Sequence, residues 1–199
     1  MLPLFLAALL AAAVPARAQS VDVHLPEASS RSVAHVGDTL TVDVAVDLGS
    51  LHVSGVALYL TVPARGLALL PAADTRPLEP HLFADGVEFA NHAVAPRDAF
   101  GVSEAASLLA YAVVLGPGAD RFRSGPGILA RVRLVCTEPA EAAAIGVFSN
   151  PIHTSMAVLD DGRTEVPLIA GDGLVVTVSE PSAKRAASTW GAVKALARP

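Results

Sequence analysis

The residues that could perform acid–base or metal chemistry are scattered along the chain. The six histidines have no spacing typical of a metal site, and no G-x-S-x-G, H-E-x-x-H or phosphate-binding loop is present. Acidic pairs such as Asp85 and Glu88 do not identify a catalytic site by their spacing alone. We therefore expect no catalytic residue, no metal ligand and no cofactor. The histidines are His24, His35, His52, His81, His92 and His153.

Three aspartates near the end of the chain could suggest a calcium site. Asp160 and Asp161 precede Gly162, and Asp172 follows later. The spacing lacks the D-x-D-x-D-G pattern and the terminal Glu of an EF-hand loop. An Asp-Gly pair between two short apolar runs instead predicts the turn of a β-hairpin.

The single cysteine, Cys136, excludes an internal disulfide. It ends the run GILARVRLVC, in which arginines alternate with apolar residues. This alternation places Cys136 on the same face as Val132 and Leu134, so we expect a buried thiol that acts as a small hydrophobic residue.

Residues 1–18 have the composition of a secretory signal peptide. The apolar stretch from Leu2 to Val14 is too short to span a bilayer, and Ala16-Arg17-Ala18 supplies small residues where signal peptidase cleaves. We predict cleavage before Gln19 and a secreted or cell-surface protein, with an uncleaved N-terminal anchor as the alternative. No other run has the roughly 18 apolar residues of a membrane-spanning helix, so we expect no transmembrane span in the mature chain.

Charge is distributed unevenly along the remaining chain. Residues 19–180 contain nineteen Asp and Glu against nine Arg and no Lys, a net charge of −10, whereas residues 181–199 carry four basic residues and no acid. An acidic body does not match the phosphates of DNA or RNA, so we expect no nucleic acid partner.

Short runs in which apolar and polar residues alternate dominate residues 19–180. Such runs, bounded by Gly, Pro, Asp or Ser, predict an all-β domain built as a single β-sandwich. The proline-rich residues 71–106 predict variable loops around one short strand. The five clearest runs are residues 38–48, 53–62, 107–115, 127–136 and 173–178.

The alternation also assigns side chains to the two faces of each strand. Asp43 falls on the solvent face of its strand, whereas Tyr111 falls on a core face. Ala57, Tyr59 and Thr61 share the face of their strand that points away from the core.

Residues 181–199 form a linker followed by a short basic segment. In STWGAVKALAR, Ser188 or Thr189 can cap a helix on which Trp190 and Val193 share an apolar stripe. A helix this short is not stable alone in water. We therefore predict that it docks through Trp190, Val193 and Lys194 on its own domain, on another protein or on a membrane surface.

Five segments, in their order along the chain, resemble a cohesin domain. VGDTLTVDVAVD is similar to the family's strand entry, and VSGVALYLTV and LLAYAVVLG are similar to strands that follow it. GPGILARVRLVC resembles the strand after a glycine turn, and DDGRTEVPLIAGDGLVVTV resembles the terminal hairpin and last strand. The resemblance covers residues 20–180.

The resemblance implies a β-sandwich of jelly-roll topology, a fold shared with carbohydrate-binding modules, and a domain without enzymatic activity. Cohesins bind dockerin modules, which carry calcium in EF-hand-like loops. We therefore predict three parts: a signal peptide (residues 1–18), a cohesin-like sandwich (19–180) and a basic tail (181–199). The predicted function is that of an exported, non-catalytic module for dockerin-type attachment to another protein. The predicted contacts are Ala57, Tyr59, Thr61 and Asn91 on one sheet face, with Phe83 and Phe100 as loop contacts.

Two other functions remain open. A carbohydrate-binding module would bind a cell-wall or extracellular polysaccharide, although residues 19–180 contain no Trp to stack on a sugar ring, which leaves loop aromatics such as Phe83 and Phe100. A structural envelope protein would be attached through its C-terminal tail.

Overall fold

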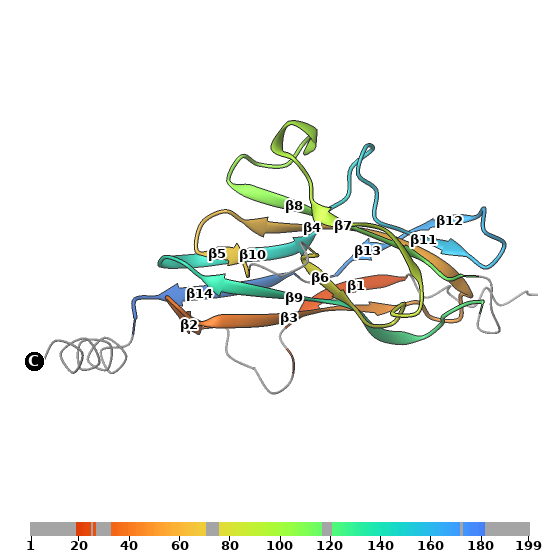
Figure 1. Cartoon of the computed structure of the whole chain (residues 1–199), viewed down its shortest axis with the longest axis horizontal. Helices are drawn as coiled ribbons and strands as arrows, with labels where there is room; N and C mark the ends of the chain where they lie inside the picture. The colour runs from red at the N-terminus through yellow and green to blue at the C-terminus, as the bar shows by residue number, and fades with distance from the viewer. Residues whose placement is uncertain are drawn as a thin grey trace, which may run out of the picture.

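The structure is a computed structural model of an all-β chain in which two sheets pack face to face (Figure 1). In the part of the chain that it describes, the only helical element is one turn of 3-10 helix, η2 (Pro96–Asp98), and no helix is long and apolar enough to cross a membrane. The predicted β-sandwich is confirmed. The described residues are 19–24, 26, 33–70, 76–116, 121–171 and 173–181.

The predicted signal peptide, residues 1–18, lies outside the described residues. The predicted tail contacts Trp190, Val193 and Lys194 lie outside them too. These assignments therefore stay predictions.

The smaller sheet has six strands around the long antiparallel pair β3 and β9. Val42 lies opposite Val132 and Leu40 opposite Leu134, so the apolar positions of both strands face the same side. The strand order is β13-β1-β3-β9-β5, and β6 also pairs with β9. The strands are β1 (Ser20–His24), β3 (Thr39–Asp47), β5 (Leu67–Leu69), β6 (Leu78–Pro80), β9 (Pro126–Cys136) and β13 (Ile169–Ala170).

The larger sheet has eight strands and is centred on β4. One edge of β4 pairs along most of its length with β8, and β7 pairs with the far edge of β8. The other edge of β4 pairs first with β11 and then with β10, which continues to β14 and β2. The strands are β2 (Val33–His35), β4 (Val53–Pro63), β7 (Val87–Ala93), β8 (Ala106–Val114), β10 (Ala140–Val147), β11 (Met156–Leu159), β12 (Glu165–Pro167) and β14 (Leu174–Ser179).

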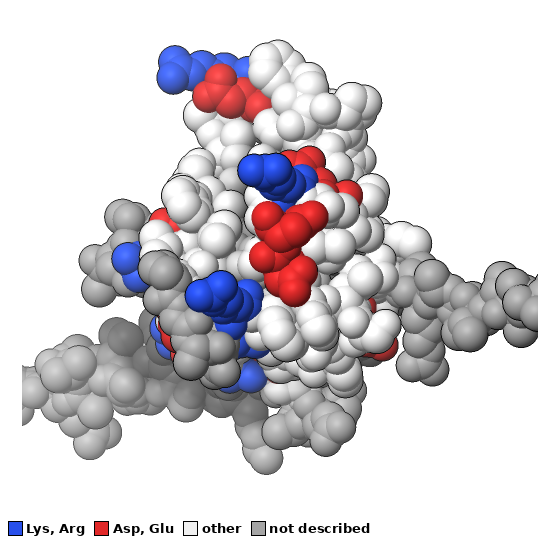
Figure 2. All heavy atoms as spheres, turned by 90° about the vertical axis from the view of Figure 1, so that its right-hand side faces the viewer, with Lys and Arg blue, Asp and Glu red and all other residues white. Residues whose placement is uncertain are grey.

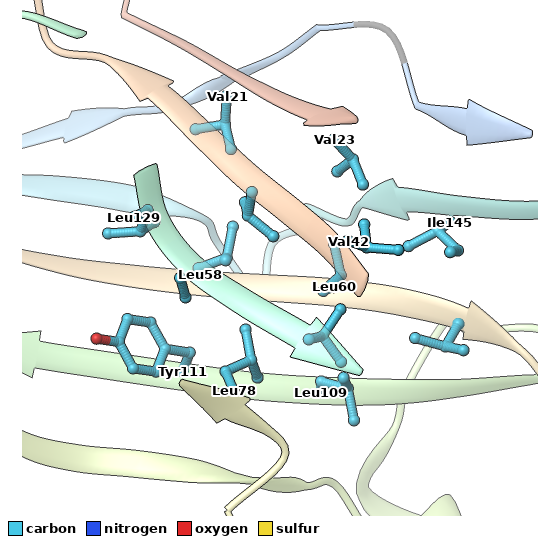
Figure 3. Packing of buried hydrophobic residues seen from close by; sticks show 14 of the residues in the cluster. Val21, Val23, Val42, Leu58, Leu60, Leu78, Leu109, Tyr111, Leu129 and Ile145 are labelled. Carbon is cyan, nitrogen blue, oxygen red and sulfur yellow. The ribbon is translucent and has the colours of Figure 1, made fainter. Parts of the chain in front are cut away.

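The core between the sheets is aliphatic, as the composition predicts (Figure 3). Leu58 and Leu60 of β4 are fully buried against residues such as Leu129 of the opposite sheet. Tyr111 and Cys136 also lie in this core, which confirms the faces assigned to them from alternation. Burial raises the pKa of the Cys136 thiol, so the thiol stays protonated and unreactive at neutral pH.

Asp43 lies on the face that alternation predicts, but its side chain is buried. It points to the solvent side of β3 as expected, yet it is 4% exposed because the side chain of Arg131 on β9 covers it. Arg131 donates from Nε to Asp43 Oδ1 at 2.6 Å and from Nη2 to Oδ2 at 3.0 Å. This bidentate pair raises the pKa of the guanidinium and satisfies both carboxylate oxygens.

Removing the Arg131 charge should destabilise the sandwich, because the Asp43 carboxylate would stay buried without a partner. We expect Arg131→Met to lower the free energy of unfolding by about 2 kcal/mol, the low end for a buried pair since Arg131 itself is partly exposed. Urea unfolding followed by circular dichroism measures the change. Arg133→Met, two residues along β9 and exposed, is the control and should change stability by less than about 0.5 kcal/mol. Equal losses in both variants would show that the ion pair contributes nothing specific.

Candidate partner-binding face

The outer faces of the two sheets differ in charge. On the smaller sheet, Glu79, Arg131 and Asp43 lie side by side on three neighbouring strands. On the larger sheet, no outward position of β4, β7 or β8 carries an acid, an arginine or a lysine, going by the pairing of their described residues. The part of the larger sheet formed by β4, β7 and β8 is therefore the surface on which an uncharged contact can be desolvated at lower cost.

The predicted contacts Ala57, Tyr59 and Thr61 lie together on this outer face. All three are partly buried and alternate with core residues of β4. Across β8, Ala112 lies opposite Ala57 and Ala110 opposite Tyr59. Apart from Tyr59, the centre of the face is made of small side chains, and we call Ala57, Thr61, Ala110 and Ala112 its flat centre.

A β-bulge at Phe89 shapes the edge of this face. The pairing of β7 with β8 skips from Glu88 to Ala90, so Phe89 has no partner on β8 and is 73% exposed. Val87 and its cross-strand partner Val114 lie next to it and are exposed as well. Together, Val87, Phe89 and Val114 make an apolar rim.

Asn91 does not lie on the face to which the prediction assigned it. Its partner on β8 is Tyr111, a core residue, so Asn91 points to the inner side of β7. There its Oδ1 accepts the Leu78 N–H at 3.0 Å and its Nδ2 donates to the Leu78 carbonyl at 2.7 Å. The amide takes the place of a strand partner for β6 and joins the two sheets at this edge. The prediction was wrong because the bulge at Phe89 reverses the alternation along β7.

Phe83 is not a loop contact either. It is 1% exposed and belongs to the core cluster. Residues 81–86 fold back on the sheet through Leu82, which donates its N–H to the Ile128 carbonyl, and Gly86, which donates to the Phe83 carbonyl. Residues 81–86 therefore have the composition of a loop, but they place the ring of Phe83 in the core.

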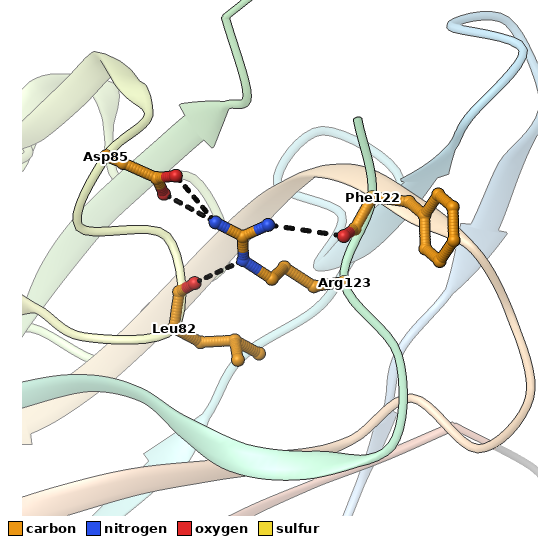
Figure 4. A network of polar contacts seen from close by, with 4 residues as sticks. All are labelled: Leu82, Asp85, Phe122 and Arg123. Atoms are coloured by element: carbon orange, nitrogen blue, oxygen red, sulfur yellow. Dashed lines mark hydrogen bonds and ion pairs between the residues drawn. The ribbon is translucent and has the colours of Figure 1, made fainter. Parts of the chain in front are cut away.

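Arg123 holds this loop in place (Figure 4). Its Nε donates to the Leu82 carbonyl at 3.0 Å, and its Nη2 lies 2.7 Å from both carboxylate oxygens of Asp85. The bond from Arg123 lowers the pKa of the Asp85 carboxyl. The side chain of Arg123 is 19% exposed. Because it contacts both Leu82 and Asp85, its guanidinium joins two loops that are distant in sequence.

Phe100, the other predicted loop contact, is 56% exposed on the loop between β7 and β8. Asn150 Nδ2 donates to the Phe100 carbonyl at 2.8 Å. Asn150 Oδ1 accepts the N–H groups of Ile152 and His153. Ile152, which the sequence analysis did not select, is 62% exposed. We call Phe100 and Ile152 the apolar knob.

His153 ties the knob to the sheet. Its Nε2 lies 2.9 Å from the Asp98 carbonyl, and since a carbonyl oxygen only accepts, the ring donates from Nε2. The ring also packs against Tyr59, with centroids 4.9 Å apart. Buried Ser155 accepts the Tyr59 N–H and donates to the Phe148 carbonyl. Tyr59 therefore supports the knob at its base.

The flat centre, the apolar rim and the apolar knob form one candidate partner-binding face. In the described part of the chain, no three His, Cys, Asp or Glu side chains gather where they could hold a metal ion. The carboxylate of Asp161 is hydrogen-bonded within its own turn: it accepts the Thr164 hydroxyl and the N–H groups of Thr164 and Arg163. These hydrogen bonds lower the pKa of the Asp161 carboxyl to about 2.

Figure 2 views the end of the sandwich that lies on the right of Figure 1. Acidic and basic side chains lie there in small mixed groups, with wide uncharged surface between them. This end offers no large field of one sign, which argues against recognition by charge alone.

Comparison with known proteins identifies the fold. No protein-family model and no curated protein matches the sequence. Among solved structures, a type II cohesin domain from the cellulosome of Acetivibrio cellulolyticus is 13% identical, with a TM-score of 0.57 over 80% of this chain and 95% of that one. A cohesin module from a family 33 glycoside hydrolase of Clostridium perfringens is 12% identical, with a TM-score of 0.55 over 82% and 98%.

A type I cohesin–dockerin complex from Clostridium thermocellum is also similar, at 12% identity with a TM-score of 0.54 over 82% of this chain and 95% of that one. Identities this low establish the fold alone. The chain has the fold of cohesin modules, and the resemblance seen in its sequence is confirmed at that level.

The Asn91 amide should be essential for closing the sandwich between β6 and β7. We expect Asn91→Leu to lower the free energy of unfolding by about 1–3 kcal/mol, because the N–H and carbonyl of buried Leu78 lose their partner. Chemical denaturation gives the value. The neighbouring exposed His92 provides the control, and His92→Leu should stay within about 0.5 kcal/mol of the parent. A stable Asn91→Leu variant would mean that water replaces the amide.

Proposed function

We propose that this protein is a non-catalytic binding module that attaches a dockerin-type module of another protein through its partner-binding face. One observation carries the proposal: the outer side of β4, β7 and β8 carries no acid, arginine or lysine, and the exposed apolar side chains of the rim and the knob lie along it. Exposed apolar side chains grouped on one face are typical of protein contacts. The similar structures include cohesins in complex with dockerins.

The finer parts of this proposal come from the sequence. Export follows from the predicted signal peptide, and a jelly-roll sandwich over residues 19–180 follows from the cohesin resemblance. Ala57, Tyr59 and Thr61 are proposed as the centre of the contact and Phe100 as part of its boundary. Asn91 and Phe83 are no longer included, because both side chains serve the interior.

A polysaccharide ligand is the weaker candidate. Sugar binding of this kind needs aromatic faces that are open to solvent. Phe83 and Tyr111 are buried, and one face of Phe122 is covered by His52, whose ring is stacked on it at 3.8 Å. The exposed rings of Phe89 and Phe100 lie at the rim and the knob, with the small residues of the flat centre lying between these features.

A pull-down from the secreted and envelope proteins of the source organism tests the proposal. Residues 19–199 serve as bait, with calcium and with EDTA. We expect calcium-dependent capture of a protein with EF-hand-like repeats, identified by mass spectrometry. Capture of the same protein in calcium and in EDTA, or recovery of polysaccharide alone, would contradict the dockerin-type assignment.

A charge placed at the centre of the face should abolish this capture. We expect Ala57→Arg to weaken binding of the captured module by about tenfold or more, because a guanidinium would have to be desolvated in the contact. Titration calorimetry measures the affinity. Ala45→Arg, at a partly buried position on the outer face of the smaller sheet, is the matched control and should bind as the parent does. If Ala45→Arg is the variant that loses binding, the contact lies on the smaller sheet.

A further inference from the structure

A groove of about 740 Å³ lies at the end of the sandwich where β14 ends, on the left of Figure 1. One wall is formed by Pro63 at the end of β4 and by Ala105. The other wall is formed by Ala140 and Ala142 of β10 and by Val178 of β14. The groove is separate from the partner-binding face and takes no part in the proposed function.

The groove exists because β10 leaves β4. The two strands pair only at Gly146 and Val147 of β10, and beyond that point β10 follows β14. The pairing of β10 with β14 shifts its register between Ala140 and Ala143, beside the groove. Gly66 lets the chain pass close to β10 beneath the groove, since a Cβ there would lie 2.7 Å from the Cβ of Ala140, and its φ of 87° suits glycine alone.

The rim of the groove is mostly acidic. Glu141 lies in its lining, and Glu138 lies next to it, 3.6 Å from Arg65. Glu180 follows Ser179, the last lining residue of β14. Glu141 and Glu138 therefore outnumber Arg65 beside a largely apolar lining.

The C-terminal segment of the chain starts beside this groove. His35 Nδ1 lies 3.0 Å from the Glu180 carbonyl and fixes the point at which the chain leaves β14. Residues 182–199 begin two positions later and contain four basic residues, no acid and the only Trp of the protein. From Pro181 to Trp190 an extended chain spans up to about 30 Å, so Trp190 can reach any part of a groove that begins at Ser179.

We propose that residues 182–199 dock in this groove of their own domain, with Trp190 against the apolar floor and the basic side chains near the acidic rim. The apolar stripe of the segment needs a surface to cover it, and the groove is lined by Thr177, Val178 and Ser179 of the strand from which the segment leaves. Opposite charges at the rim select this segment over other apolar sequences.

Trp190 fluorescence tests the proposal directly, because no other Trp contributes. In the chain of residues 19–199 we expect emission that is blue-shifted, and quenched less by acrylamide, than in a peptide of residues 182–199. The shift should not depend on protein concentration, since docking is intramolecular. It should shrink as salt is added, because the rim is exposed.

Ala142→Arg places a positive charge in the groove and should return Trp190 to the emission and quenching of the peptide. Ala144→Arg is the matched control, because Ala144 is an exposed residue of the same strand outside the lining, and it should keep the parent values. Peptide-like emission in the parent chain would overturn the proposal, as would a shift that appears only at high protein concentration or only with lipid vesicles. Dockerin capture is measured separately, so either proposal can fail alone.

Discussion

The structure depends on how the two edges of β4 are shared. One edge pairs with β8 from Gly55 to Pro63 without interruption. The other edge is divided between β11 and β10, and neither strand pairs with Tyr59. Backbone groups in a sheet must find partners, so the gap at Tyr59 is filled by the Ser155 hydroxyl and the Phe148 N–H. The loop between β10 and β11 is consequently forced to emerge above the sheet at this point.

Both proposed binding regions follow from this division. Above Tyr59 the emerging loop carries Asn150 and His153, which hold the Phe100 loop and build the apolar knob. Beyond Thr61, β10 turns away from β4 and leaves the groove beside Pro63. One irregularity in strand pairing therefore produces a raised contact above Tyr59, near the middle of β4, and a hollow beside Pro63, where β4 ends.

The sandwich is closed by side chains where its backbone pairing stops. Asn91 joins β7 to β6, Arg123 joins the loop before β7 to the loop before β9, and Arg131 covers Asp43 on the outer face. Asn91 and Arg131 satisfy Leu78 and Asp43, which would otherwise be buried without partners, and an unsatisfied buried group costs more than the bond itself contributes. On the outer face of the larger sheet, by contrast, Ala57 and Ala112 face outward opposite each other and carry no polar side chain.

Local periodicity was enough to predict the long strands, the burial of Tyr111 and Cys136, and the shared outward face of Ala57, Tyr59 and Thr61, because side chains alternate strictly along a regular strand. Two residues were misassigned for reasons that lie elsewhere in the chain: the bulge at Phe89 turned Asn91 inward, and the fold-back of residues 81–86 buried Phe83. Asp43 lies on the predicted outer face, but Arg131 of another strand covers it. The knob and the groove were not predictable either, since each is made by segments from distant parts of the sequence, and only the pairing of β4 with two different strands brings those segments together.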